Sequence, residues 1–136
     1  MQMQFDIQGG DFSAAGEASS EVKKALKQLN IQPQTLRRIA VALYEAEVNV
    51  VAHAYRGTMT VDISPARIRV QLQDEGPGIA DIGKAMEEGF STASDKVREM
   101  GFGAGMGLPN IKKNSDEMHL TSTPGTGTTL EIIVNF

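Results

Sequence analysis

The sequence predicts a two-layer α/β (α+β) sandwich, in which a mixed, largely antiparallel sheet carries helices on one face. Segments in which apolar and polar residues alternate, as in half-buried strands, come in consecutive pairs along the chain. Segments with helical spacing of apolar residues lie before and between these pairs. The length of 136 residues suits one domain, which we expect to span residues 1–136.

The chain is expected to begin with a strand and a helix. Apolar side chains alternate with polar ones over residues 3–7, and two glycines end this strand. Asp11 or Ser13 is expected to cap a helix that runs to about Leu29 and places Leu29 on its apolar face.

A second helix and a hairpin are expected next. Pro33 favours a helix start, and apolar residues keep helical spacing to about Ala54. Gly57 is interpreted as the stop of this helix. Alternation over residues 58–63 and 67–73, with Ser-Pro between, predicts a β-hairpin.

The remaining segments complete the sheet. The pattern predicts a short helix over residues 81–88, a mobile loop over 89–104 and a helix over 106–113. Residues 117–122 and 128–134 are expected to form a hairpin around a Pro-Gly-Thr-Gly turn.

Composition excludes several classes of function. With 13 Lys+Arg and 17 Asp+Glu the formal net charge is −4, and no basic stripe indicates a nucleic-acid partner. The chain has no Cys, which excludes disulfides and thiolate chemistry. No stretch has the ~20 apolar residues of a membrane helix, so we expect a cytoplasmic protein without a membrane partner. Glycine is enriched, at 14 residues.

Three polar residues recur on one face of the second predicted helix. Glu45, Asn49 and His53 are spaced four apart and therefore share a stripe. One interpretation is that this stripe faces solvent. The other is that it lines a wet cleft, where Glu45 serves as a base and Asn49 gives an oxygen to a hard cation such as Mg²⁺.

Two glycine-containing segments are candidate ligand loops. Asp74-Glu75-Gly76-Pro77-Gly78-Ile79 follows a strand and is either an ordinary turn or a fixed carboxylate that accepts a hydrogen bond from an exocyclic amine, such as that of adenine. The segment from Gly101 to Gly107 leads into a helix and is either a surface loop or a phosphate-binding loop. It does not match the dinucleotide fingerprint, and the near-match to a phosphate loop at residues 78–85 ends in Ala85 where Ser or Thr is required.

Taken in order, these segments resemble the motifs of one superfamily. EAEVNVVAH, DEGPGI, GFGAGMGLPNI and PGTGTT follow one another as in the GHKL ATPases, which have the Bergerat ATP-binding fold. The resemblance covers essentially the whole chain. Within this superfamily the chain resembles the small anti-sigma-factor serine/threonine kinases and the stressosome switch kinase, and the segments MEEGFST and GAGMGLPNIKK are especially similar to the switch kinase.

The resemblance implies a role for each matching residue. Glu45 would be the catalytic base, Asn49 the Mg²⁺ ligand, and Asp74 the partner of the adenine amino group, backed by Thr128. Residues 89–104 would be the lid over ATP. The positions implied to surround ATP are Asn49, His53, Asp74, Gly76, Gly78, Ile79, Gly101, Gly103, Gly105, Met106, Gly107, Leu108 and Thr128.

One departure from the motifs of the anti-sigma kinases leaves two functions open, a kinase and a binding module without kinase activity. Many anti-sigma kinases carry an Arg just before the Gly-Met-Gly triplet, where this chain has Gly103-Ala104; Lys96 and Arg98 in the lid are candidate substitutes. The resemblance implies ATP and Mg²⁺ as cofactors and a kinase that phosphorylates a Ser or Thr of a STAS-domain antagonist. The alternative is an ATP-responsive partner-switching module without kinase activity. A sigma factor is a further candidate partner, a homodimer is compatible with the resemblance, and a histidine-kinase domain acting on a separate chain is a third reading.

Overall fold

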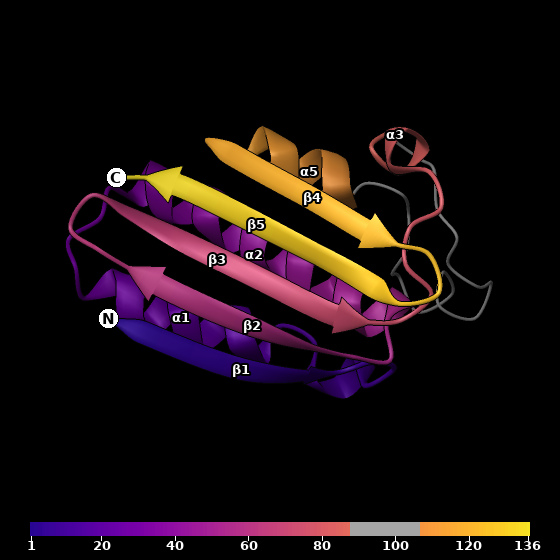
Figure 1. Ribbon diagram of the computed structural model, residues 1–136. Coiled ribbons are helices and arrows are strands. Elements are labelled where there is room, and N and C mark those ends of the chain that lie inside the picture. The colour runs from indigo at the N-terminus through magenta and orange to yellow at the C-terminus, as the bar shows by residue number, and fades with distance from the viewer. Residues whose placement is uncertain (88–106) are drawn as a thin grey trace.

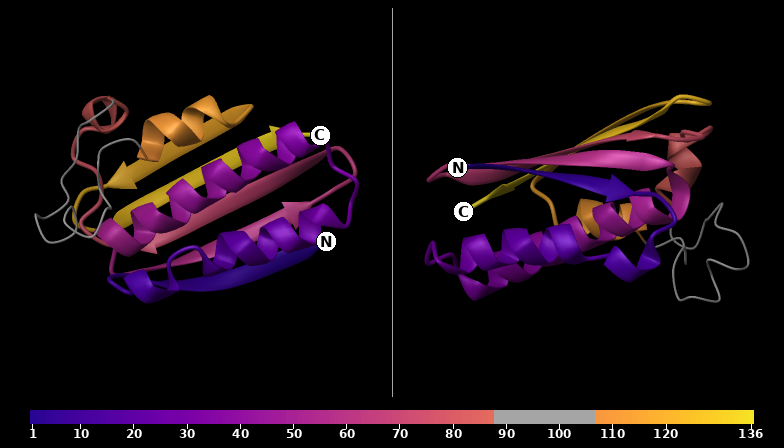
Figure 2. Two further views of the ribbon diagram at one scale, coloured as in Figure 1. Left: turned by 180° about the vertical axis from the view of Figure 1, so that it is seen from behind. Right: turned by 90° about the horizontal axis from the view of Figure 1, so that it is seen from below.

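The computed structural model describes residues 1–87 and 107–136, which form a sheet layer and a helix layer (Figures 1 and 2). The five strands lie in the order β1-β2-β3-β5-β4. Every pairing is antiparallel, so the predicted two-layer, largely antiparallel architecture is confirmed. The strands are β1 (Gln2–Gln8), β2 (Arg56–Ile63), β3 (Arg67–Glu75), β4 (Glu117–Thr123) and β5 (Gly127–Asn135).

The helices cover one face of this sheet (Figure 2). The longest helix, α2 (Pro33–His53), packs against α1 (Glu17–Lys27) and against α5 (Gly107–Lys113). Its start at Pro33 agrees with the sequence, because proline lacks only a donor that the first turn leaves unused. A short helix, α3 (Ile82–Ala85), lies beyond the end of β3. Among the described residues, no helix combines the length and the apolar character that a membrane span needs.

The core lies between the layers. In β2 and β3, alternate residues point toward the helices and are almost fully buried, whereas most of their neighbours face solvent. In β5, Leu130, Ile132 and Val134 belong to the core in the same way, and Ile133 between them is buried as well. This alternation follows from the period of two along a strand. The most deeply buried large side chains include Leu26, Ile39, Leu43, Met59, Val61, Ile68, Val70, Ile111 and Ile132.

The start of the first helix differs from the sequence expectation. Neither Asp11 nor Ser13 caps it: the Ser13 hydroxyl donates to Asp11, and both lie at a 3-10 turn over Phe12–Ala14. The helix begins only at Glu17, after Gly16 in a left-handed conformation with φ of 97°. Leu29 was also wrongly placed on the apolar face. It is 44% exposed, because α1 ends at Lys27 and its helical repeat does not extend that far.

Gly57 does not stop the second helix. Helix α2 ends at His53, where the Tyr55 N–H donates to the Glu75 carbonyl at 2.8 Å and the chain joins the sheet. Gly57 is a buried residue of β2, and a Cβ there would lie 2.9 Å from Val50 Cγ1. The glycine therefore lets the strand pass close beneath the helix.

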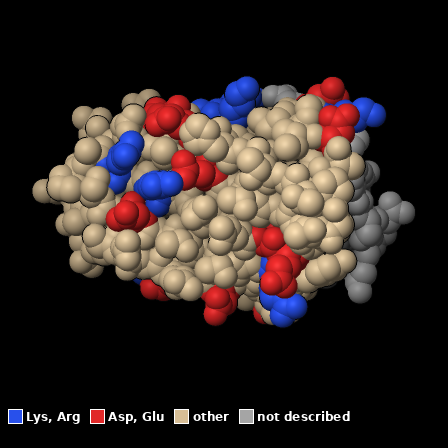
Figure 3. Space-filling view, viewed as in Figure 1, with Lys and Arg blue, Asp and Glu red and all other residues tan. Residues whose placement is uncertain are grey.

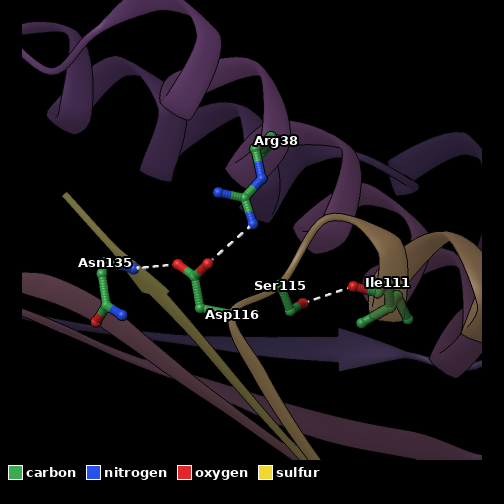
Figure 4. Close-up of polar contacts among 5 residues, drawn as sticks. All are labelled: Arg38, Ile111, Ser115, Asp116 and Asn135. Carbon is green, nitrogen blue, oxygen red and sulfur yellow. Dashed lines mark hydrogen bonds and ion pairs between the residues drawn. The ribbon is translucent and has the colours of Figure 1, made fainter.

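Polar contacts hold the end of the α5–β4 connection (Figure 4). The Asp116 carboxylate accepts from the Asn135 N–H at 2.7 Å and from Arg38 Nη2 at 3.2 Å. These contacts, the Asn135 bond first, lower the pKa of Asp116. The Ser115 hydroxyl donates to the Ile111 carbonyl at 2.6 Å and closes the end of α5. Strand β5, helix α2 and the α5–β4 connection are thus tied together.

The outer face of the sheet is open to solvent. On the part of this face that Figure 3 shows in colour, acidic and basic side chains lie beside one another. The cross-strand pair of Arg69 and Glu131 is one example, with Arg69 Nε 2.9 Å from the carboxylate. Such exposed pairs contribute little to stability.

Candidate functional site

A cavity of about 810 Å³ opens between the layers, with walls from the second half of α2, the end of β3, the start of β5, the β3–α3 connection and the start of α5. The strand β3 and the helix α2 both end on this side, away from the two chain termini (Figure 1). A cavity of this size is typical of sites for nucleotide-sized ligands. Its lining residues come from all parts of the chain that the sequence analysis singled out, apart from those beyond the described ranges.

The α2 wall carries the predicted polar stripe. Glu45, Asn49 and His53 all line the cavity, so the stripe belongs to a cleft and not to the open surface. Asn110 Nδ2 on α5 lies 3.5 Å from Glu45 Oε1. Burial lowers the pKa of His53 and thereby favours its neutral imidazole.

The start of α5 faces the two residues expected to do chemistry. A Cβ built on Gly107 would lie 3.4 Å from Asn49 Oδ1 and 3.6 Å from Glu45 Oε2. The backbone of Gly107 therefore approaches an amide oxygen and a carboxylate at once, and a side chain there would take up the space in front of both. Leu108, the next residue, also lines the cavity.

Glu47 has a different place, which the sequence analysis did not identify. Its side chain is 2% exposed and points to the start of α1. The carboxylate accepts from the N–H groups of Gly16 at 2.9 Å, Ala18 at 3.3 Å and Ser19 at 2.8 Å, and also from the Ser19 hydroxyl. These N–H groups have no partner within α1 itself. Glu47 therefore caps α1 from a distance, in place of Asp11 or Ser13.

The floor of the cavity presents acceptor oxygens. Asp74 pairs with Thr128 in the β3–β5 register, and Asp74 Oδ1 accepts from the Thr128 N–H at 3.1 Å. Burial raises the pKa of Asp74, and the Thr128 hydrogen bond partly offsets the rise. Both residues line the cavity, beside the apolar side chains of Leu72, Leu120 and Leu130.

A hydroxyl network fixes the orientation of Thr128. The Ser122 hydroxyl lies 3.0 Å from the Gly127 carbonyl and must donate its single proton there. In the 2.9 Å contact between Ser122 Oγ and Thr128 Oγ1, the Thr128 hydroxyl is then the donor. Because the Thr128 hydroxyl uses its hydrogen in this bond, its oxygen can only accept a hydrogen bond from a ligand in the cavity. Ser122 also accepts from the Ile79 N–H at 2.7 Å.

The loop after β3 is held against the β4–β5 hairpin. Gly78 has φ of 72°, and a Cβ on it would lie 2.5 Å from the Thr123 carbonyl oxygen. Gly125 donates to the Pro77 carbonyl at 2.7 Å. Gly78 and Ile79 line the cavity, whereas Gly76 is buried next to Ala54 and does not. Only glycine fits position 78, on both conformational and steric grounds.

Some predicted residues lie outside the described ranges, and some lining residues were not predicted. Lys96, Arg98, Gly101, Gly103, Gly105, Met106 and the expected lid over residues 89–104 all fall outside the described residues. The residues that sequence reasoning missed are Asp81 and Lys84 in the lining, Asn110 beside Glu45, and Ser122 behind Thr128. Asp81 and Lys84 lie within the rejected phosphate-loop match, and Asn110 lies in the GFGAGMGLPNI segment, so these three had a usable signal; nothing in the sequence marked Ser122.

Residues 11–134 match the histidine kinase-like ATPase domain. The chain belongs to this family. The family, the fold and the ATP-binding class expected from the sequence are thereby confirmed.

Among the described residues, no cluster of three or more His, Cys, Asp or Glu side chains could hold a metal ion.

Two curated relatives extend this assignment. Serine/threonine-protein kinase RsbT of Bacillus subtilis (strain 168) is 33% identical over 115 residues, which cover 82% of this chain and 80% of RsbT. The anti-sigma F factor of Thermoanaerobacter sp. (strain X514) is 37% identical over 106 residues, covering 74% and 71% of the two chains. The family thus includes a protein kinase and anti-sigma factors similar to this chain, as the sequence predicted.

Two solved structures share the fold. A chain with RsbU and RsbW domains from Mycobacterium tuberculosis matches with a TM-score of 0.66 and 13% identity over 98% of this chain, which spans 32% of the larger one. The SiaB–SiaC complex of Pseudomonas aeruginosa contains a chain that matches with a TM-score of 0.65 and 14% identity, over 97% of this chain and 88% of that one.

Proposed function

We propose that this protein is an ATP-dependent serine/threonine protein kinase of the anti-sigma-factor type, whose substrate is a STAS-domain protein. The observation that carries the proposal is the placement of Glu45 and Asn49 together in front of Gly107, at one end of a cavity whose floor presents Asp74 and Thr128. In this proposal Glu45 is the base, Asn49 gives an oxygen to the metal, and Asp74 and Thr128 recognise the purine, all within one cavity.

The floor favours adenine. Asp74 and Thr128 both present acceptor oxygens, once the Thr128 proton is donated to Ser122. An exocyclic amino group supplies donors to such oxygens, directly or through water, whereas a carbonyl oxygen at the same ring position would meet acceptors only. Leu72, Leu120 and Leu130 give the ring an apolar surface. The site therefore selects an aminopurine over an oxopurine.

Asn49 on α2 and Gly107 at the start of α5, which lie opposite each other, fit a magnesium nucleotide. Asn49 Oδ1 is an oxygen ligand of the kind that Mg²⁺ accepts, and the glycine opposite leaves space in front of it. Bound Mg²⁺ would neutralise charge on the phosphate oxygens. The glycines of residues 101–107 and the cations Lys96 and Arg98 are proposed to contact the phosphates.

Glu45 is proposed as the base in phosphoryl transfer. The hydroxyl oxygen of the acceptor Ser or Thr bonds to the γ-phosphorus, and the bond from that phosphorus to the β–γ bridging oxygen breaks. The electron pair leaves with ADP, and the hydroxyl proton passes to the Glu45 carboxylate. Asn110, at 3.5 Å from Glu45 Oε1, orients this carboxylate.

The partner class follows from the relatives and the fold. Anti-sigma F factors are among the similar proteins, and one structural neighbour is part of a SiaB–SiaC complex. A phosphate adds about −1.5 to −2 charges to a partner at pH 7, enough to disrupt an interface. We propose that phosphorylation releases a STAS-domain antagonist in the cytoplasm, with a sigma factor as a second candidate partner and a homodimer as a candidate assembly.

Transfer of label from γ-labelled ATP tests this proposal. Purified STAS-domain proteins from the organism that encodes this chain are mixed with the protein, Mg²⁺ and labelled ATP. We expect label on a Ser or Thr of one of them, and little with Glu45→Ala. No transfer by the wild type, or undiminished transfer by Glu45→Ala, would refute the kinase assignment.

The second candidate is a binding module that responds to ATP without chemistry. It is favoured by the absence of an Arg at Gly103-Ala104 in the sequence. Calorimetry distinguishes the two: the module binds ATP and ADP, changes its affinity for the partner with the nucleotide, and forms no phosphoprotein.

A further inference from the structure

A second hollow lies on the helix layer, between α1 and the first half of α2. It has a volume of about 500 Å³. We name it the α1–α2 groove; its apolar lining consists of Pro33, Leu36, Ala40, Val41 and Tyr44. Val41 and Tyr44 are 36% and 40% exposed, which is high for large apolar side chains within a helix. The apolar residues follow one stripe of α2, at spacings of three and four.

This groove ends at the nucleotide cavity. Glu45 lines both hollows and stands at the boundary between them. Any chain that follows the groove toward the C-terminal end of α2 therefore arrives at the proposed base. A groove on a kinase that leads to the base is in the right place to deliver a hydroxyl group.

The charge of the groove is opposite to that of the whole chain. The protein has a formal net charge of −4, yet Lys23 and Arg37 both line the groove and Glu45 is the acidic residue there. No ion pair within the described residues engages Lys23 or Arg37. Glu17 and Glu21 line an adjoining hollow that Lys23 also lines, so their negative charges weaken the attraction of Lys23 for an acidic side chain. Arg37 does not line that hollow and is therefore the better partner for an acidic side chain.

The length of the groove sets the size of its occupant. Pro33 and Glu45 are twelve residues apart on α2, which corresponds to about 18 Å along the axis. An extended segment rises about 3.3 Å per residue, so about five residues fit. Tyr44, an exposed aromatic residue beside the Glu45 end, and Arg37, about one turn from the Pro33 end, are of the residue types that anchor protein interfaces.

We propose that the α1–α2 groove binds the segment of the STAS-domain substrate that carries the phosphorylated Ser or Thr. About five residues of that segment lie along α2. The hydroxyl is at Glu45, apolar side chains pack on Tyr44 and Leu36, and an acidic side chain pairs with Arg37. This inference rests on the kinase function proposed above.

Charge reversal and aromatic truncation test the groove. The probes are purified STAS-domain proteins from the organism that encodes this chain, with labelled ATP for transfer and a non-hydrolysable ATP analogue for binding. Arg37→Glu and Tyr44→Ala are each expected to raise KM for the acceptor about tenfold, with kcat and nucleotide affinity unchanged. The control is Arg67→Glu, an exposed charge at the start of β3 that lines none of the hollows described here. When one acidic residue near the acceptor Ser or Thr of the STAS-domain protein is replaced by Lys, the KM of Arg37→Glu for that acceptor is expected to return toward the wild-type value.

The outcomes separate this inference from the proposed function. If wild-type protein labels a STAS-domain protein and both groove variants do so with unchanged KM, the groove assignment is refuted while the kinase assignment stands. Loss of nucleotide affinity in both variants would also refute the groove assignment, since the two residues would then affect ATP binding in the cavity and not binding of the acceptor. If the wild type neither binds nor labels any of these proteins, the kinase proposal and the groove proposal fall together. A KM effect with charge-swap rescue supports the groove.

Discussion

Glu45 and Glu47 lie two residues apart on α2, on opposite sides of the helix. Glu47 is 2% exposed, and its carboxylate accepts three backbone N–H groups and a hydroxyl at the start of α1. Glu45 lines the cavity and, within the described residues, accepts one hydrogen bond, from Asn110 Nδ2 at 3.5 Å. The first carboxylate is saturated and structural; the second is left with free acceptor capacity, which is what a base requires.

The difference teaches how one helix serves both folding and chemistry. A buried carboxylate is tolerated only when its acceptor capacity is used, and the four donors at α1 use it. A carboxylate at a cavity wall must instead keep an oxygen available for the ligand. The two residues are of the same type and lie two positions apart in the sequence, so only their surroundings assign the roles.

The largest effect is expected from Glu45→Ala. Removal of a general base lowers the rate of phosphoryl transfer by about 10²–10⁴-fold. Stability and ATP affinity are expected to be unchanged, because within the described residues the side chain makes one long hydrogen bond. Single-turnover transfer and thermal melting measure the two. A variant that melts well below the wild type would show that Glu45 has a structural role like that of Glu47.

The converse is expected for Glu47→Ala. Loss of the carboxylate leaves several buried donors at the start of α1 without a partner, and we expect a loss of about 3 kcal/mol in the free energy of unfolding. Glu47→Gln keeps acceptor oxygen and should lose less. Urea unfolding measures both, with the exposed Glu21→Ala as a control, since the Glu21–Lys24 pair is open to solvent. Equal stability of Glu47→Ala and wild type would contradict the capping role.

Asp74→Asn separates ligand recognition from stability at the cavity floor. The variant presents an amide donor where the adenine amino group needs an acceptor, so ATP affinity should fall about 10- to 100-fold, as measured by calorimetry. Burial raises the pKa of Asp74, so folding favours its protonated form. The stability contribution is present below the unfolded value of 3.8 and is lost as pH rises through the folded pKa.

The pH dependence of the stability of Asp74→Asn relative to wild type is the control for the Asp74→Asn prediction. At pH 7 the wild type has a buried charge that Asp74→Asn lacks, and the variant should be at least as stable. The difference should shrink as pH falls through the raised pKa of Asp74 toward 3.8. A variant less stable than wild type at pH 7 would show that the carboxylate, and not only its oxygen, holds the Thr128 N–H in place.

The smallest effect is expected from Arg38→Ala, at the exposed contact between α2 and Asp116. Both side chains are about one third exposed, so the loss should be at most about 1 kcal/mol in thermal or urea unfolding. Because the pKa of Asp116 is lowered, its stabilising contribution should be present at neutral pH and lost as pH falls through the folded value, below 3.8. A loss as large as that of Glu47→Ala would contradict the contrast between exposed and buried contacts.

Much of the fold could be predicted because strand and helix periods are local. Alternation over residues 58–63 and 67–73 predicted the hairpin, and the register Val61 to Val70 follows from the same buried face. The start of α1 could not be predicted, because its cap comes from Glu47, 28 residues away from Ser19. Asp11 and Ser13 are plausible caps by local sequence, but the Glu47 carboxylate accepts the N–H groups at the start of α1 instead. Gly57 was misread because its role depends on the close passage of Val50.

For the site, the sequence by itself determined the chemical types and their order: Glu45, Asn49 and His53 on one helix face, Asp74 after a strand, and glycines before the last helix. Helical spacing brings such residues together without any tertiary information. Only the tertiary structure decided that Asn110 contacts Glu45, that Ser122 accepts the hydrogen bond of the Thr128 hydroxyl, and that Glu45 lines both the cavity and the groove. Those relations join residues from separate elements, and side-chain packing between layers, not local periodicity, sets them.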